Sequence, residues 1–156
     1  MKKRTLPEMN YLAELVGEFI EYWGFKNIHG KIWVNLYLSE TPLDAAALIE
    51  KLQVSKALIS ISLKELMDYN VIFEVGLSDN GTRLYTANSD LHEVISQVLR
   101  QREKIMMGKI KAAFDQLKKM PVQELMASGI RNEKVKELDR FMKKGEKALD
   151  TLMAIL

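Results

Sequence analysis

Apolar residues recur every three or four positions along most of this chain, the spacing at which a helix buries one face. The first such pattern covers residues 6–23 and stops before Gly24, a residue that readily adopts the left-handed backbone that ends a helix. A second helix is predicted over about residues 28–38. After a break at Pro42, Asp44 is a favourable N-cap for a third helix in the run AAALIEKL.

The next segment, QVSKALISISLKEL (residues 53–66), predicts a fourth helix that begins after a short turn and is capped by Ser55. At helical spacing, Ile59, Leu63 and Leu66 share one face and should point into the core. A solvated helix would carry Lys and Glu opposite that face. The other sides of this helix instead offer a partly apolar and mostly uncharged set, namely Ala57, Leu58, Ser60, Ile61, Lys64 and Glu65. The pattern therefore indicates a helix that contacts something other than water.

Beyond residue 70 the pattern changes from helical to β-prone. The runs VIFEV (71–75) and RLYTA (83–87) are separated by GLSDNGT, in which Asn80 and Gly81 favour a hairpin turn. The sequence therefore predicts a short two-stranded hairpin directly after the fourth helix.

Two long helices are predicted in the remainder of the chain. One runs from Ser89, taken as its N-cap, to about Met120, and Pro121 ends it. The last starts near Asn132 and has a nearly heptad apolar stripe. That stripe consists of Val135, Leu138, Met142, Gly145, Leu149, Leu152 and Leu156. The apolar stripes of the two long helices are larger than the rest of a small domain could cover, so a second copy of the chain is the expected partner.

Composition excludes several classes of function. The chain is 47% hydrophobic and 28% charged, as expected for a folded protein, and without cysteine it has no thiol nucleophile or Cys-ligated zinc. The two histidines, His29 and His92, lack an accompanying carboxylate cluster, so no metal site is predicted. We find no Gly-rich phosphate loop or catalytic constellation, and expect neither an enzyme nor a cofactor.

Hydropathy and charge bear on the protein's location and on its partners. No stretch approaches about 18 uncharged apolar residues, and the basic start is not followed by a signal-peptide core, so a cytoplasmic protein without membrane contact is expected. The net charge of +2 is unevenly distributed. Residues 1–39 carry 5 basic and 4 acidic groups, residues 40–90 carry 4 and 8, and residues 91–156 carry 14 and 9. The middle segment is therefore acidic, with a net charge of −4.

Helix, short turn, helix and then a β-hairpin is the order of a winged helix-turn-helix. Several sequence blocks over roughly residues 10–88 make the assignment more specific, because they resemble the GbsR branch of the MarR-like transcriptional regulators. The blocks are Ile28-His29-Gly30-Lys31-Ile32-Trp33, Tyr37-Leu38-Ser39, Pro42-Leu43, Val54-Ser55-Lys56, Ile59-Ser60, Leu63-Lys64-Glu65-Leu66, Val71-Ile72 and, in the wing, Gly81-Thr82-Arg83-Leu84-Tyr85.

The resemblance implies a mostly α-helical fold with a small hairpin wing, in which long dimerisation helices flank the winged domain. It implies a homodimer that binds double-stranded DNA at a pseudo-palindromic operator, as repressor or activator. The expected organisation is an N-terminal packing helix (1–27), a DNA-binding winged domain (28–88) and a helical dimerisation region (89–156).

Three positions depart from the family's pattern. Gln53 stands where the family usually has Gly at the tight turn, and Leu58 stands where it prefers a small polar residue. The wing tip, Ser78-Asp79-Asn80-Gly81, lacks the usual basic residues. These departures bear on DNA affinity rather than on the fold.

The candidate DNA-binding residues lie on the fourth helix and the wing: Ser55, Lys56, Ala57, Leu58, Ser60, Ile61, Lys64 and Arg83. Serine can bond either base type, an Ala or Ile can meet a thymine methyl group, and Lys64 would hold a phosphate. The alternative is a winged-helix module that binds protein, with Leu58 and Ile61 packed on a partner's surface. Arg83 could enter a minor groove or be simply solvated, and the basic start (residues 2–4) could be a DNA-binding arm or a soluble terminus.

Aromatic residues are concentrated in the N-terminal third of the chain, and at helical spacing they favour a core. A cage of aromatic faces is also how proteins hold quaternary ammonium ions, and the founding member of the GbsR branch responds to choline. Trp23, Trp33 and Tyr37 are therefore the candidate residues for binding a choline- or betaine-like effector.

Overall fold

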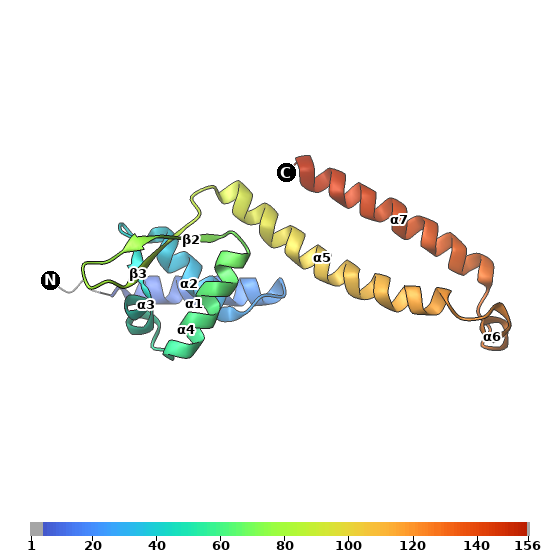
Figure 1. Ribbon diagram of the computed structural model, residues 1–156, viewed down its shortest axis with the longest axis horizontal. Helices are drawn as coiled ribbons and strands as arrows, with labels where there is room; N and C mark the ends of the chain where they lie inside the picture. Colours follow the sequence, from blue (N-terminus) through green and yellow to red (C-terminus); the bar gives the residue numbers. More distant parts are fainter. Residues whose placement is uncertain (1–4, 156) are drawn as a thin grey trace. The chain divides into compact units, whose positions relative to one another are not determined.

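The computed structural model describes residues 5–155, and the chain divides into two compact units, Met1–Val98 and Leu99–Leu156 (Figure 1). The basic residues 2–4 and Leu156, named in the predictions above, lie outside the described residues. The elements are α1 (Pro7–Tyr22), α2 (Asn27–Leu38), β1 (Leu43–Asp44), α3 (Ala45–Leu52), α4 (Lys56–Asp68), β2 (Ile72–Leu77), β3 (Arg83–Ala87), α5 (Leu91–Lys118), α6 (Val122–Ala127) and α7 (Asn132–Ile155). Helix α5 passes from one unit into the other.

Helices α1 and α2 pack closely because glycine lies at their contact. A Cβ atom placed on Gly30 would lie 2.8 Å from the carbonyl oxygen of Val16 and 3.0 Å from Cα of Gly17. Side chains larger than hydrogen would therefore push the two backbones apart. As predicted, Gly24 follows the end of α1 with a positive φ of 90°.

The helix-turn-helix is formed by α3 and α4, and both predicted caps are confirmed. Oδ1 of Asp44 accepts a hydrogen bond from the backbone N–H of Ala47 (2.9 Å), and Oγ of Ser55 accepts one from the N–H of Leu58 (3.1 Å). Between the helices, Gln53 adopts the left-handed conformation (φ 54°, ψ 47°) for which glycine is usual.

The wing is a three-stranded antiparallel sheet in the order β1-β3-β2. The hairpin between β2 and β3 was predicted, and its turn closes with the N–H of Gly81 donating to the carbonyl of Ser78 (2.9 Å). A bulge between Glu74 and Gly76 bends β2. Strand β1 was not predicted: it has two residues, and only its pairing with β3 defines it.

One hydrophobic core joins α2, α3, α4 and the sheet. Its fully buried side chains include Ile32, Leu48, Ile59 and Ile72, each 0% exposed. The core thus holds α4 by its inward face alone and leaves the rest of that helix at the surface.

In the second unit, α5 and α7 are joined through the short helix α6. The buried residues Phe114, Leu125 and Val135 come from the three helices in turn. Helix α6 was missed because Pro121 was taken only as the end of α5, whereas it is also the N-cap residue of α6. The prediction that Ser89 caps α5 was wrong: α5 begins at Leu91, and the carboxylate that accepts from the N–H of Glu93 belongs to Asp90 (3.1 Å).

Candidate nucleic-acid interface

Helix α4 presents the predicted face to the surface. Its inward residues Ile59, Ser62, Leu63 and Leu66 are buried. Glu65 is half-buried, whereas the candidate DNA-binding residues on this helix and its cap are all exposed: Ser55, Lys56, Ala57, Leu58, Ser60, Ile61 and Lys64. Leu58 is 37% exposed and Ile61 56%, which is unusual for side chains of this kind on a helix that has a core to pack against. The structure thus brings seven of the eight candidate DNA-binding residues onto one helix and its cap.

A polar cluster ties α4 to the loop before α2. Nζ of Lys26 donates to Oε1 of Glu65 on α4 (2.9 Å), and Nε2 of His29 lies 3.7 Å from Oε2 of the same carboxylate. His29 is only 3% exposed, and its Nδ1 accepts from the N–H of Lys26 (3.4 Å), so it closes the turn between α1 and α2. Burial lowers the pKa of His29, and the hydrogen bond from Lys26 lowers the pKa of Glu65. This cluster sets the position of α4 without using its outward face.

One carboxylate links the wing turn to the helix-turn-helix, in addition to the shared core and the pairing of β1 with β3. While Oδ1 of Asp44 caps α3, its Oδ2 accepts a hydrogen bond from Oγ1 of Thr82 at the base of the wing turn (2.8 Å). Asp44 and Thr82 are 38 positions apart. The cap is predictable from the sequence, but this second role is not, since nothing local in the sequence signals it.

Cations near the candidate interface are few. Lys56 and Lys64 flank the outward face of α4, and neither has an ion-pair partner within residues 5–155. Arg83, the eighth candidate residue, is 69% exposed on the wing, and its Nε lies 3.7 Å from Oε1 of Glu74 on the adjacent strand. The wing's arginine is therefore partly neutralised, whereas the two lysines are available to phosphates.

Of the three candidate effector-binding aromatics, Tyr37 is exposed, whereas Trp23 and Trp33 are half-buried and Trp33 packs against the core. The rings of Trp33 and Tyr37 stack on one another, with centroids 4.9 Å apart and planes at 16°. Trp23, at the C-terminus of α1, has its ring near Phe19 (6.0 Å) and Tyr22 (6.5 Å). Stacked faces of this kind can accept a cation, and the role of these residues remains a prediction.

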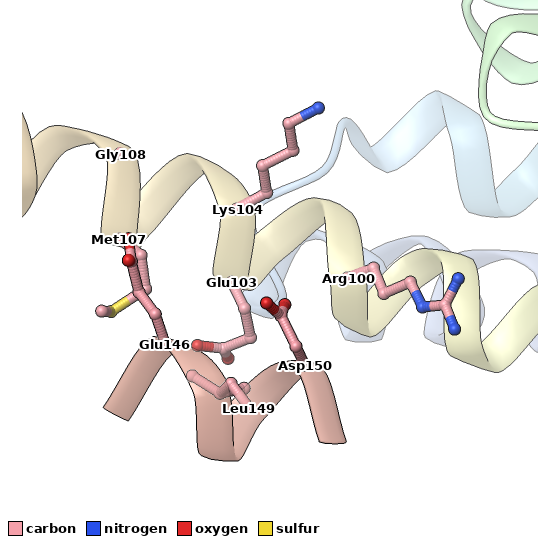
Figure 2. Close-up of a pocket in the computed structure, with 8 residues that line it drawn as sticks. All are labelled: Arg100, Glu103, Lys104, Met107, Gly108, Glu146, Leu149 and Asp150. Atoms are coloured by element: carbon pink, nitrogen blue, oxygen red, sulfur yellow. The ribbon is translucent and has the colours of Figure 1, made fainter. Parts of the chain in front are cut away.

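A cleft of about 630 Å³ lies between α5 and α7 in the second unit. It is lined by Arg100, Glu103, Lys104, Met107, Gly108, Glu146, Leu149 and Asp150. Figure 2 shows Glu103 extending from α5 toward α7 and Asp150 extending from α7 toward α5, whereas Lys104 points away from the cleft. The sequence analysis did not anticipate it, because a gap between two helices depends on their packing and not on either sequence pattern.

Metal binding and membrane spanning find no support in the described part of the chain. Among residues 5–155 there is no group of three or more His, Asp or Glu side chains placed to hold a metal ion. Within the same residues, every helix is too short or too polar to cross a bilayer.

Comparison with known proteins establishes the fold. No family model matches the chain, and no curated protein matches it in sequence. A crystal structure of a transcriptional regulator is similar over 95% of this chain and 94% of that one, with a TM-score of 0.66 and 13% identity. More distant are an S. aureus MepR mutant bound to an oligodeoxyribonucleotide (TM-score 0.43, 14% identity, 91% and 90% coverage) and the transcriptional regulator Tm0710 from Thermotoga maritima (0.43, 17%, 94% and 92%).

The first similarity, over nearly the whole of both chains, confirms the predicted fold class: a mostly helical winged helix-turn-helix with a small wing and long flanking helices. At 13% identity it shows a shared fold and nothing finer.

Proposed function

We propose that this chain is a homodimeric, sequence-specific DNA-binding transcriptional regulator of the GbsR branch of the MarR-like family. The observation that carries the proposal is the outward face of α4, which is exposed, largely uncharged and flanked by Lys56 and Lys64. It occurs on a fold shared with a transcriptional regulator. The second helix of a helix-turn-helix is the element that enters the major groove.

The side chains on this face suit base edges. The hydroxyl of Ser60 can donate to or accept from a base, and the side chains of Ala57 and Ile61 can contact thymine methyl groups. Lys64 and Lys56 would contact phosphates, which position the helix without reading sequence. Loss of one base contact is worth roughly 1–3 kcal/mol of discrimination, whereas loss of a phosphate contact weakens binding to all sequences alike.

Exposed apolar side chains support the dimer. In the first unit α1 exposes Leu12, Leu15, Phe19 and Tyr22, and in the second unit α7 exposes Leu138, Phe141, Leu152 and Ile155. Apolar faces of this length on a soluble chain mark an interface. We expect a symmetric dimer that buries more than about 2,000 Å², the size of obligate interfaces, and that presents two copies of α4 to paired half-sites.

We further propose that the aromatic residues Trp23, Trp33 and Tyr37 serve a choline- or betaine-like effector. The stacked pair at Trp33 and Tyr37 supports this, since the face of an aromatic ring attracts a quaternary ammonium ion. Titration calorimetry with choline and with betaine tests it, and heat that disappears in Trp33→Ala is the expected result. Absence of heat with both compounds would remove the effector site and leave the DNA-binding proposal standing.

Selection of bound duplexes from a random pool is the experiment that tests DNA recognition. The expected product is a pair of inverted half-sites whose centres are separated by one helical turn or a multiple of it. Ile61→Ala should relax choice at one base pair per half-site, whereas Lys64→Ala should leave the selected sequence unchanged. A pool that remains random after selection with the wild-type protein would refute the proposal.

A protein-binding module is the second candidate function, and one observation favours it. Residues 40–90 carry a net charge of −4, which opposes approach to phosphates. In that case Leu58 and Ile61 would be anchors in a partner's pocket. Leu58→Ser separates the two functions: a regulator should keep or improve its DNA binding, since the family prefers a small polar residue there, whereas a protein-binding module should lose its partner.

A further inference from the structure

Helix α7 carries a line of cations along one side. Lys136, Arg140, Lys143 and Lys147 recur at intervals of four, three and four residues. At 3.6 residues per turn they fall within about 60° around the helix, and at 1.5 Å per residue they extend over about 16 Å. Lys144 lies at the edge of this line. We call these five residues the basic stripe.

The basic stripe is exposed and has little compensating charge. All five side chains are exposed, and among residues 5–155 only Lys143 has a carboxylate partner, Asp139 at 3.1 Å. Two of the carboxylates of α7 pair with lysines of α5: Asp139 with Lys118 at 2.9 Å and Glu146 with Lys111 at 3.6 Å. Glu133 and Asp150 are also exposed and by helical spacing lie beside the stripe, so the stripe keeps an excess of positive charge rather than a purely basic surface.

The stripe also lies away from the side by which α7 packs. Val135, Met142 and Leu149 are centred about 130° around the helix from the basic residues. Val135 is buried, and the apolar side as a whole is the one that the proposed dimer would cover. Dimerisation would therefore leave the basic stripe in solvent.

From this arrangement we propose that the basic stripe of α7 is a second DNA-contacting surface, which binds the phosphates of duplex DNA without regard to sequence. The inference rests on the proposed function, because it takes DNA as the partner. It addresses the low positive charge of the winged unit: the acidic segment 40–90 supplies few phosphate contacts, whereas a row of four cations, unpaired within the described residues, matches the closely spaced charges of a duplex.

A duplex fits the stripe better than an anionic membrane does. A helix that lies in a membrane inserts its apolar side into the lipid and keeps its basic residues level with the headgroups. On α7 the apolar side is the one that the proposed dimer would cover, so that side is not available for insertion into lipid. Phosphates on a rigid duplex require only an exposed, charged line.

The salt dependence of DNA binding tests the proposal. The probe is a fluorescent 30-base-pair duplex of arbitrary sequence, titrated with the full-length protein over a range of KCl concentrations. The test variant combines Lys136→Gln, Arg140→Gln and Lys147→Gln. The control variant makes the same charge change elsewhere in the second unit, with Lys109→Gln, Lys119→Gln and Lys134→Gln. Each lost phosphate contact lowers the slope of log K against log [KCl] by about 0.9, so the test variant should lose roughly 2–3 in slope and the control less than 1.

A charge-preserving variant controls for loss of structure on substitution at these positions. Lys136→Arg with Lys147→Arg should keep the wild-type slope. Equal slopes for the test and control variants would overturn the inference while leaving base reading by α4 intact. No binding of any duplex by the wild-type protein would overturn both proposals together. If the test variant kept its DNA slope but lost binding to vesicles of phosphatidylcholine and phosphatidylserine, the stripe would be a membrane surface and the inference would be wrong.

Discussion

Replacement of Gly30 by alanine should destabilise the first unit, because α1 and α2 meet there without space for a methyl group. The new Cβ would lie 2.8 Å from the carbonyl oxygen of Val16 and 3.0 Å from both Cα and N of Gly17. These atoms belong to a backbone and cannot rotate away as a flexible side chain could. Relief therefore requires that α1 as a whole moves outward by several tenths of an ångström.

The size of the effect follows from two opposing terms. Forcing an extra methyl group into a packed contact costs about 1–3 kcal/mol, and we expect the upper part of that range because the neighbours are backbone. Alanine is better than glycine within a helix by up to about 1 kcal/mol, which offsets part of the cost. The net loss should be about 1–2 kcal/mol, or roughly 4–16 °C in Tm for a unit of about 100 residues.

Urea unfolding followed by tryptophan fluorescence measures this loss selectively. Both tryptophans, Trp23 and Trp33, lie in the first unit, so the signal reports that unit. Gly108→Ala is the matched control, since a Cβ there meets nothing within 4 Å. It should leave the fluorescence transition unchanged. A Gly30→Ala protein with an unchanged or higher urea midpoint, at the same protomer concentration, would refute the reasoning.

Three further predictions concern single contacts. Burial holds the pKa of His29 below its ordinary value of 6.5, so the unfolded chain binds more protons than the folded chain as the pH falls toward 5.5. The urea midpoint should therefore fall as the pH is lowered, and His29→Gln should abolish this pH dependence. Asp44→Ala should cost about 1 kcal/mol more than Thr82→Val, since it loses the α3 cap as well as the bond to the wing; equal urea midpoints would contradict this. Phe141, 72% exposed on α7, should lie in the proposed dimer interface; Phe141→Glu should convert the dimer into a monomer by sedimentation, and an unchanged dimer would place the interface elsewhere.

Local signals account for what the sequence predicted well. The caps at Asp44 and Ser55 need only the residue itself and the three that follow, and the inward side of α4 needs only helical spacing. The left-handed turn at Gln53 was anticipated through the family resemblance, in which glycine is usual at that position. Each of these features depends on a few consecutive residues, and the structure has each of them.

Contacts between distant segments account for what was missed. The bond from Thr82 to Asp44 and the pairing of Lys26 with Glu65 join residues 38 and 39 positions apart. The side chains involved are common surface types, and no spacing rule distinguishes them from their solvated neighbours. Strand β1 was missed for the same reason, since a two-residue strand is defined only by its pairing with β3.

The basic stripe could have been recognised from the sequence, because its spacing of four, three and four residues is helical. It was overlooked because charge was summed over long segments, and α7 also contains acidic residues that lower the sum. The ion pairs toward α5 show that Asp139 and Glu146 are engaged by lysines of that helix. Charge placement around a helix is more informative here than net charge.

The most direct test of base reading by α4 is the ratio of two dissociation constants. One is measured on the duplex recovered by selection and the other on the same duplex with its half-sites scrambled, at one fixed salt concentration. A specific regulator should prefer the selected duplex by about 10³ or more. Ile61→Ala loses one contact in each of the two half-sites, so it should reduce that ratio by roughly 30-fold or more while affinity for the scrambled duplex stays the same. A wild-type ratio near one, or a ratio that Ile61→Ala leaves unchanged, would contradict the claim that this face of α4 reads DNA.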